Sequence, residues 1–130
     1  MNLDWDALER IEMTSWLLRP NDVMNYSIVI HGRQSKPNPE ALLLARQAIE
    51  HVELFLSSAR TLLGAFIKPS LLEDGISPDS FHFDDYGNSF WIYFNLVSDT
   101  TAHWKVRIVR LEADGCILDY RPQELARLEQ

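Results

Sequence analysis

The sequence predicts an α+β fold, in which an antiparallel sheet of five to six strands carries one long amphipathic helix on one face. Apolar residues recur with three- and four-residue spacing between Pro39 and Phe66, which is the periodicity of a helix. On either side of this segment the chain has short aromatic and β-branched runs that are typical of strands. The predicted order of elements is therefore ββαββββ. At 130 residues, of which 46% are apolar, residues 1–130 are expected to form a single domain.

The first two strands are expected to form a hairpin. Residues 8–18 show weak strand alternation, and we assign them to its first strand. Residues 19–22, Arg-Pro-Asn-Asp, are a turn signal. Residues 25–31 then read as the second strand, which Gly32 ends.

The long helix has a clear start signal. Asn38 is a good N-cap, Pro39 suits the first helical position, and Glu40 adds a favourable negative charge in the first turn. The helix must end before Pro69, or a turn earlier at Gly64, so it spans about 40 Å. Its apolar stripe is expected to lie on the sheet and consists of Leu42, Ala45, Ile49, Val52, Leu56, Ala59, Leu63 and Phe66.

Residues 68–80 are predicted to be a connector without regular structure over more than one turn, because they contain Pro69, Gly75 and Pro78. The rest of the chain alternates strand and turn signals. The expected strands are residues 81–84, 89–97, 104–111 and 116–120, with turns at 85–88 and 113–115 and a short helix or frayed tail at 122–130.

The strand at residues 89–97 carries large residues on both of its faces. Phe90, Ile92, Phe94 and Leu96 form one face, while Trp91, Tyr93 and Val97 form the other. Only one face can meet the helix, so the other is covered by a terminal segment, a partner or a ligand. The last option predicts a small-ligand or peptide-binding face made of Trp91, Tyr93 and Trp104, with Lys105 and Arg107 beside them.

The composition limits the class of protein. The net charge of −7 argues against a general binder of nucleic acid, which would need a basic face. Cys116 is the single cysteine, so no internal disulfide forms, and this fits a reducing compartment. The acidic N-terminus does not resemble a secretory signal, and no apolar run approaches the roughly 20 residues of a membrane span. We expect a soluble, cytoplasmic protein that does not insert into membranes.

The sequence contains no phosphate-binding, dinucleotide-binding, nucleophile-elbow or zinc-protease motif. His82 and Asp84 share a strand face and would form a metal site with His103 if the strand of His103 is adjacent, but isolated polar strand residues usually face solvent. We therefore expect no catalytic residues, no resident metal and no cofactor. The chain is not expected to be an enzyme.

An acidic run is the main candidate for a partner-binding surface. It consists of Glu73, Asp74, Asp79, Asp84 and Asp85, with Tyr86 beside it as an aromatic anchor. Clustered charge of one sign speeds association with a partner of opposite charge. The alternative is that these residues form an ordinary solvated loop.

The stretch Lys36-Pro37-Asn38-Pro39-Glu40, which leads through Leu44 and Ala45 into the helix, carries a resemblance. Over residues 27–118 the chain is similar to small uncharacterised bacterial α+β proteins, some of which resemble immunity proteins that neutralise secreted toxins. The resemblance implies a non-enzymatic protein-binding domain with a basic toxin domain as its partner, and no functional residue carries over. The small-ligand or peptide-binding face is the alternative. Self-association as a homodimer through the apolar residues Trp91, Leu43 and Leu54 is a further expectation.

Overall fold

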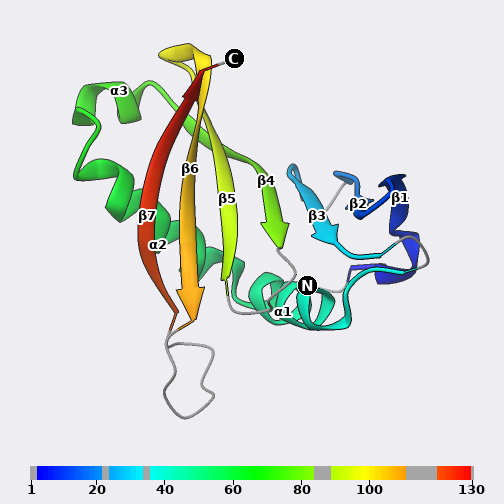
Figure 1. Ribbon diagram of the computed structural model, residues 1–130. Helices are drawn as coiled ribbons and strands as arrows, with labels where there is room; N and C mark the ends of the chain where they lie inside the picture. Colours follow the sequence, from blue (N-terminus) through cyan, green and yellow to red (C-terminus); the bar gives the residue numbers. More distant parts are fainter. Residues whose placement is uncertain (1–2, 22–23, 34–35, 84–88, 111–119, 130) are drawn as a thin grey trace.

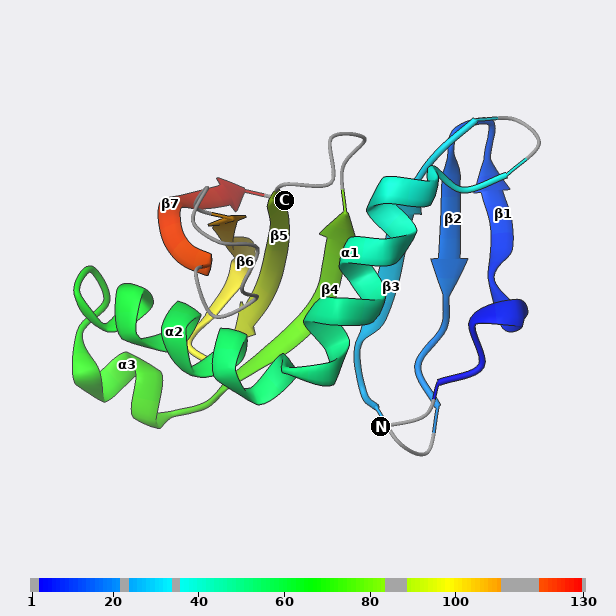
Figure 2. The ribbon, with the colours of Figure 1, turned by 90° about the horizontal axis from the view of Figure 1, so that it is seen from below.

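The computed structural model of the chain (Figure 1) describes residues 3–21, 24–33, 36–83, 89–110 and 120–129. These residues form one seven-stranded mixed sheet whose strands lie in the order of the sequence. Helices cover one face of it (Figure 2). The strands are β1 (Glu9–Glu12), β2 (Ser15–Leu18), β3 (Ser27–His31), β4 (Ile76–Phe83), β5 (Ser89–Leu96), β6 (Asp99–Arg110) and β7 (Tyr120–Glu129). The helices are η1 (Trp5–Ala7), α1 (Pro39–Glu50), α2 (Val52–Gly64) and α3 (Pro69–Glu73).

The α+β class is confirmed, but the prediction of a purely antiparallel sheet was wrong. β3 and β4 run parallel, with Ser27 opposite Ser80 and Ile30 opposite Phe83. The helices form the crossover between these two strands, and such a crossover returns the chain in its original direction. The element order is therefore three strands, three α-helices and four strands within the described residues.

β4 begins inside the segment predicted to be an irregular connector. Pro78 lies within this central strand, where a proline normally argues against a strand. The pairing of β4 with β5 shifts register between Pro78 and Ser80, so the proline lies next to a bulge. The sequence carries no signal for this bulge, which explains the error.

The N-terminal prediction merged two strands into one. Residues 8–18 contain β1 and β2, which pair with each other in an antiparallel hairpin. β2 then pairs with β3, as expected of residues 25–31. The first hairpin was missed because its turn contains neither glycine nor proline.

The single long helix is also wrong, because the helix breaks near its middle at His51. This residue has φ −120° and ψ 30°, and its N–H bonds to the carbonyl of Ala48 at 3.1 Å. α1 and α2 consequently run in different directions across the sheet (Figure 2). The break lets each half follow a different part of a twisted sheet. Periodicity does not reveal it, since the apolar stripe continues through Ile49 and Val52.

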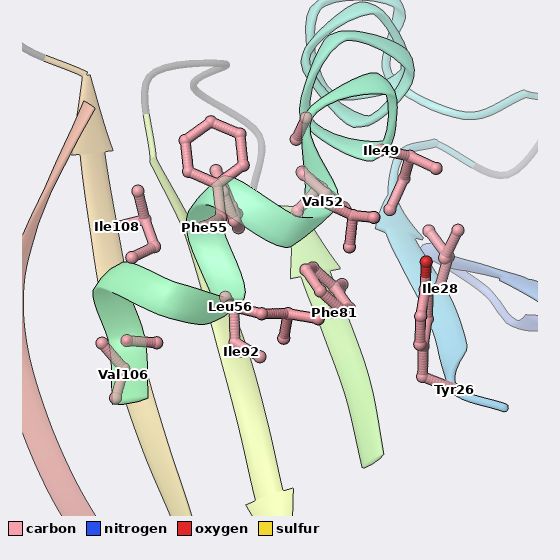
Figure 3. Close-up of a cluster of buried hydrophobic side chains, with 14 of the residues drawn as sticks. Tyr26, Ile28, Ile49, Val52, Phe55, Leu56, Phe81, Ile92, Val106 and Ile108 are labelled. Carbon is pink, nitrogen blue, oxygen red and sulfur yellow. The ribbon is translucent and has the colours of Figure 1, made fainter. Parts of the chain in front are cut away.

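The core lies between these helices and the sheet (Figure 3). Val52, Leu56 and Leu63 are buried, as the stripe predicts. The start of α1 is confirmed as well, because the side chain of Asn38 accepts a hydrogen bond from the N–H of Glu40 at 2.9 Å. Phe66 departs from the stripe and is 69% exposed, because α2 ends at Gly64.

The C-terminal segment is a strand rather than a helix or tail. β7 pairs with β6 along most of its length and forms the last strand of the sheet. Its register places Leu125 opposite Val106, so the strand contributes to the helix-covered face. The predicted strand at residues 116–120 and the turns at 85–88 and 113–115 lie largely or wholly outside the described residues. Among the residues that are described, no helix is both long and apolar enough to cross a membrane.

Candidate binding face

The sheet has one face against the helices and one face without them, which we call the outer face. Figure 2 shows α1 and α2 on the same side of the sheet. The N-terminal hairpin and β7 extend the two edges of the sheet instead of folding across it. Over the part of the chain that the structure describes, no helix or strand forms a layer on the outer face.

Two aromatic side chains and a lysine occupy the middle of the outer face. Trp91 and Tyr93 project from β5, and Tyr93 is paired with Lys105 on β6. The ammonium nitrogen of Lys105 lies 4.0 Å from the centroid of the Trp91 ring and 5.8 Å from that of Tyr93. All three side chains are half-buried. A cation over aromatic rings is stabilised by their quadrupoles, so the three groups hold one another in place.

The neighbouring cation, the guanidinium of Arg107, takes part in an ion pair. Arg107, which is paired with Trp91, donates to Glu124 of β7 at 2.8 Å and to the hydroxyl of Ser89 at 3.3 Å. Glu124 neutralises this guanidinium. Among the described residues, Lys105 has no such carboxylate within salt-bridge distance. Its ammonium group lies over the two aromatic rings instead.

His82 extends the aromatic surface onto β4. Its ring lies 4.3 Å from the ring of Tyr93, and its Nε2 lies 2.9 Å from the hydroxyl of Ser80. Burial lowers the pKa of His82 to about 4, and electrostatic interactions with His31 and Lys105 act in the same direction against the opposing effect of Asp79. The imidazole is consequently neutral at pH 7.

The group around His82 does not have the geometry of a catalytic triad. Asp79 accepts hydrogen bonds from Asn95 at 3.2 Å and from Ser80 at 3.4 Å. In a triad the carboxylate orients the histidine, and the histidine then activates the serine. Here the carboxylate contacts the serine, which is itself buried. The network fixes the orientation of side chains on the face, a role suited to binding.

Trp104 does not belong to this face, which corrects the predicted aromatic set. Its partner in the register is Phe94, a core residue on the helix-covered side. The indole N–H of Trp104 donates to Asp99 at 2.9 Å. Pattern alone did not fix the register of β6, and a shift of one residue exchanges the two faces. The alternation of Phe81, His82 and Phe83 could have identified His82 as an outer-face residue.

The predicted acidic surface is only partly described. Glu73 is the last residue of α3 and Asp74 follows it, and both are exposed. Asp79 lies on β4, where it contacts Asn95. Asp84, Asp85 and Tyr86 lie outside the described residues. Glu73 and Asp74 lie at the end of α3, whereas Asp79 lies within β4. The structure therefore does not gather these three acidic residues into one loop.

The metal site considered from the sequence, formed by His82, Asp84 and His103, is likewise only partly described. Asp84 lies outside the described residues, and His82 shares its Nε2 contact with Ser80. The described residues contain no group of three or more His, Cys, Asp or Glu side chains arranged to hold a metal ion.

Comparison of the chain with protein-family models, with curated proteins and with solved structures gave no match.

Proposed function

We propose that this chain is a non-enzymatic protein-binding domain and that the outer face of its sheet is the binding surface. The observation that carries the proposal is the group of Trp91, Tyr93 and Lys105 at the centre of a face without a covering layer. Tryptophan and tyrosine dominate the binding energy of many interfaces, because they bury a large area while losing little conformational freedom. The neutral His82 ring beside Tyr93 enlarges the same surface.

In its sharpest form, the proposal is an immunity protein that neutralises a bacterial toxin domain. The net charge of −7 supports a basic partner, because long-range attraction accelerates encounter. The charges described on the outer face itself include the paired Arg107 and Glu124. We therefore propose that the aromatic residues Trp91 and Tyr93 provide most of the affinity, whereas the negative net charge increases the rate of association.

The test begins with a partner that co-purifies with the full chain from its native cell. Once that protein is purified, calorimetry is performed with wild type, Trp91→Ala and Tyr93→Ala. We expect each substitution to weaken binding by about 30-fold or more, which is the size of a hot-spot effect. Leu43→Ala is the matched control, because Leu43 is a large exposed apolar residue on α1. We expect this control to change affinity by less than about threefold.

Two other results would redirect the proposal. If Glu73→Lys and Asp74→Lys abolish binding while Trp91→Ala does not, the acidic residues carry the interface. If native mass spectrometry of the purified chain shows a bound small molecule that Trp91→Ala releases, the outer face is a ligand site. Either outcome overturns protein recognition through the outer face.

A further inference from the structure

Among the described strands, β7 forms one long edge of the sheet and has no partner on its outer side. The strand has ten residues, and it pairs with β6 along one side, from Ala102 opposite Glu129 to Arg110 opposite Tyr120. No strand in the described part of the chain pairs with its other side, which forms the end of the sheet (Figure 1). The opposite edge, β1, has only four residues and an irregular register. An open edge presents backbone N–H and C=O groups that match those of another strand.

An apolar pocket lies beside this edge on the helix-covered side. It has a volume of about 410 Å³, and Leu62 and Phe66 at the end of α2 form one wall. The rest is lined by β6 and β7, through Trp104, Gln123, Leu125, Ala126 and Arg127. The volume falls within the range of about 300–1,000 Å³ that is usual for ligand pockets. Phe66 remains 69% exposed at this pocket, although it is one of the largest apolar side chains in the protein.

Arg127, the charged residue of the pocket lining, is already paired. Arg127 donates to Asp99 at 2.8 and 3.0 Å and to Glu129 at 2.9 Å. Asp99 also accepts the indole N–H of Trp104. Two carboxylates thus neutralise the guanidinium of Arg127. The side chain that suits this largely apolar lining is neutral, with a large apolar or aromatic body.

We propose that an extended peptide segment of a partner protein adds as a further strand to β7 and inserts one bulky apolar side chain into the pocket of Phe66 and Trp104. In this mode of recognition the backbone supplies affinity, and pockets for alternate side chains supply specificity. A strand added to β7 directs every second side chain to the face that carries Leu125 and Arg127. A single extended peptide can therefore pair with the edge of β7 and place one of its side chains in the pocket.

Pairing between the β7 strands of two copies would cover the same edge, and the test below treats this arrangement as a separate outcome. This surface is separate from Trp91 and Tyr93, so it goes beyond the outer-face proposal and is tested independently.

The probe is a phage-displayed library of random ten-residue linear peptides, the length of β7, selected on the immobilised full chain. A synthetic copy of the best peptide is then titrated by fluorescence anisotropy. We expect the selected peptides to share one aromatic or large aliphatic position within a β-forming sequence. Phe66→Ala, which changes an exposed side chain, should weaken binding about tenfold or more. Tyr93→Ala, which removes an aromatic ring from the outer face, should leave it unchanged.

Methylation of the peptide backbone tests the strand itself. N-methyl groups at alternate positions should abolish binding in one parity and have little effect in the other, because only every second N–H points to β7. Failure to select peptides, equal binding to the Phe66→Ala variant, or N-methyl effects without alternation would each overturn the proposal. A dimer of the free protein in light scattering that dissociates with Phe66→Ala would show that a second copy is the occupant, and would overturn it too.

Discussion

Lys105 lies over the ring of Trp91, with its ammonium nitrogen 4.0 Å from the ring centroid. The two residues project from adjacent strands, β6 and β5, onto the outer face of the sheet. Such a contact contributes about 0.5–1 kcal/mol at an exposed site and more once water is removed. A partner that covers the indole therefore strengthens a contact that already exists. If the outer face is the binding surface that we propose, this part of it is ordered before a partner arrives.

The helix-covered core gives the first prediction. Leu56 is 4% exposed and points from α2 toward the sheet, beside Ile92 (Figure 3). Leu56→Ala should lower the free energy of unfolding by about 2–5 kcal/mol, because it leaves a cavity. Leu54→Ala is the control, since Leu54 lies on the same helix and is 44% exposed, and it should cost less than about 0.5 kcal/mol. Urea denaturation measures both, and equal losses would contradict the assigned packing.

The N-cap of α1 gives the second prediction. Asn38 accepts hydrogen bonds from the N–H groups of Glu40 and Ala41 at 2.9 and 3.3 Å. Asn38→Ala should destabilise the protein by about 1 kcal/mol, because two helix donors lose their acceptor. Asn38→Ser retains a cap and should stay within a few tenths of a kcal/mol of wild type. Thermal unfolding of the three proteins compares them, and a serine variant as weak as the alanine variant would argue against capping.

The environment of His82 predicts a pH dependence of stability. Burial lowers its pKa in the folded state from the usual 6.5 to about 4. Below pH 6.5 the unfolded chain binds a proton that the folded chain does not, so stability falls as the pH falls from about 6.5 to about 4. The loss corresponds to at most about 3 kcal/mol and levels off below the folded pKa.

His82→Gln isolates this effect from the carboxylates that also titrate in acid. In urea denaturation between pH 7 and pH 4.5, the free energy of unfolding of wild type should fall more steeply with decreasing pH than that of the variant, because only wild type carries the histidine with the lowered pKa. Parallel curves would show that His82 titrates alike in the folded and unfolded states.

The parts of the fold set by local pattern were predictable. The N-cap at Asn38, the buried stripe through Leu56 and the strand at residues 89–97 all follow from spacing and turn chemistry. The break at His51 was not predictable, because no proline or glycine marks it in the sequence. The parallel pairing of β3 and β4 was hidden by Pro78, which lies next to a bulge that only the fold reveals.

In the candidate site, too, the features set by local pattern were predictable and those set by strand pairing were not. Alternation within β5 correctly placed Trp91 and Tyr93 opposite the core. Trp104 was misplaced because the register between β5 and β6 depends on their pairing, which is not a local property. The pocket beside Phe66 joins the end of α2 to β7, and a C-terminal segment predicted as a helix or tail gave no reason to expect it.

The most direct test of outer-face recognition is a titration of the ¹⁵N-labelled chain with the purified partner, followed through the tryptophan indole N–H resonances. Trp91 lies on the outer face, and Trp104 on the helix-covered face serves as a control within the same spectrum. Trp91→Phe and Trp104→Phe assign the two signals. We expect the Trp91 resonance to shift or broaden until the partner is saturating, while that of Trp104 stays in place. An unchanged Trp91 resonance at saturation would contradict the assignment of the outer face as the binding surface.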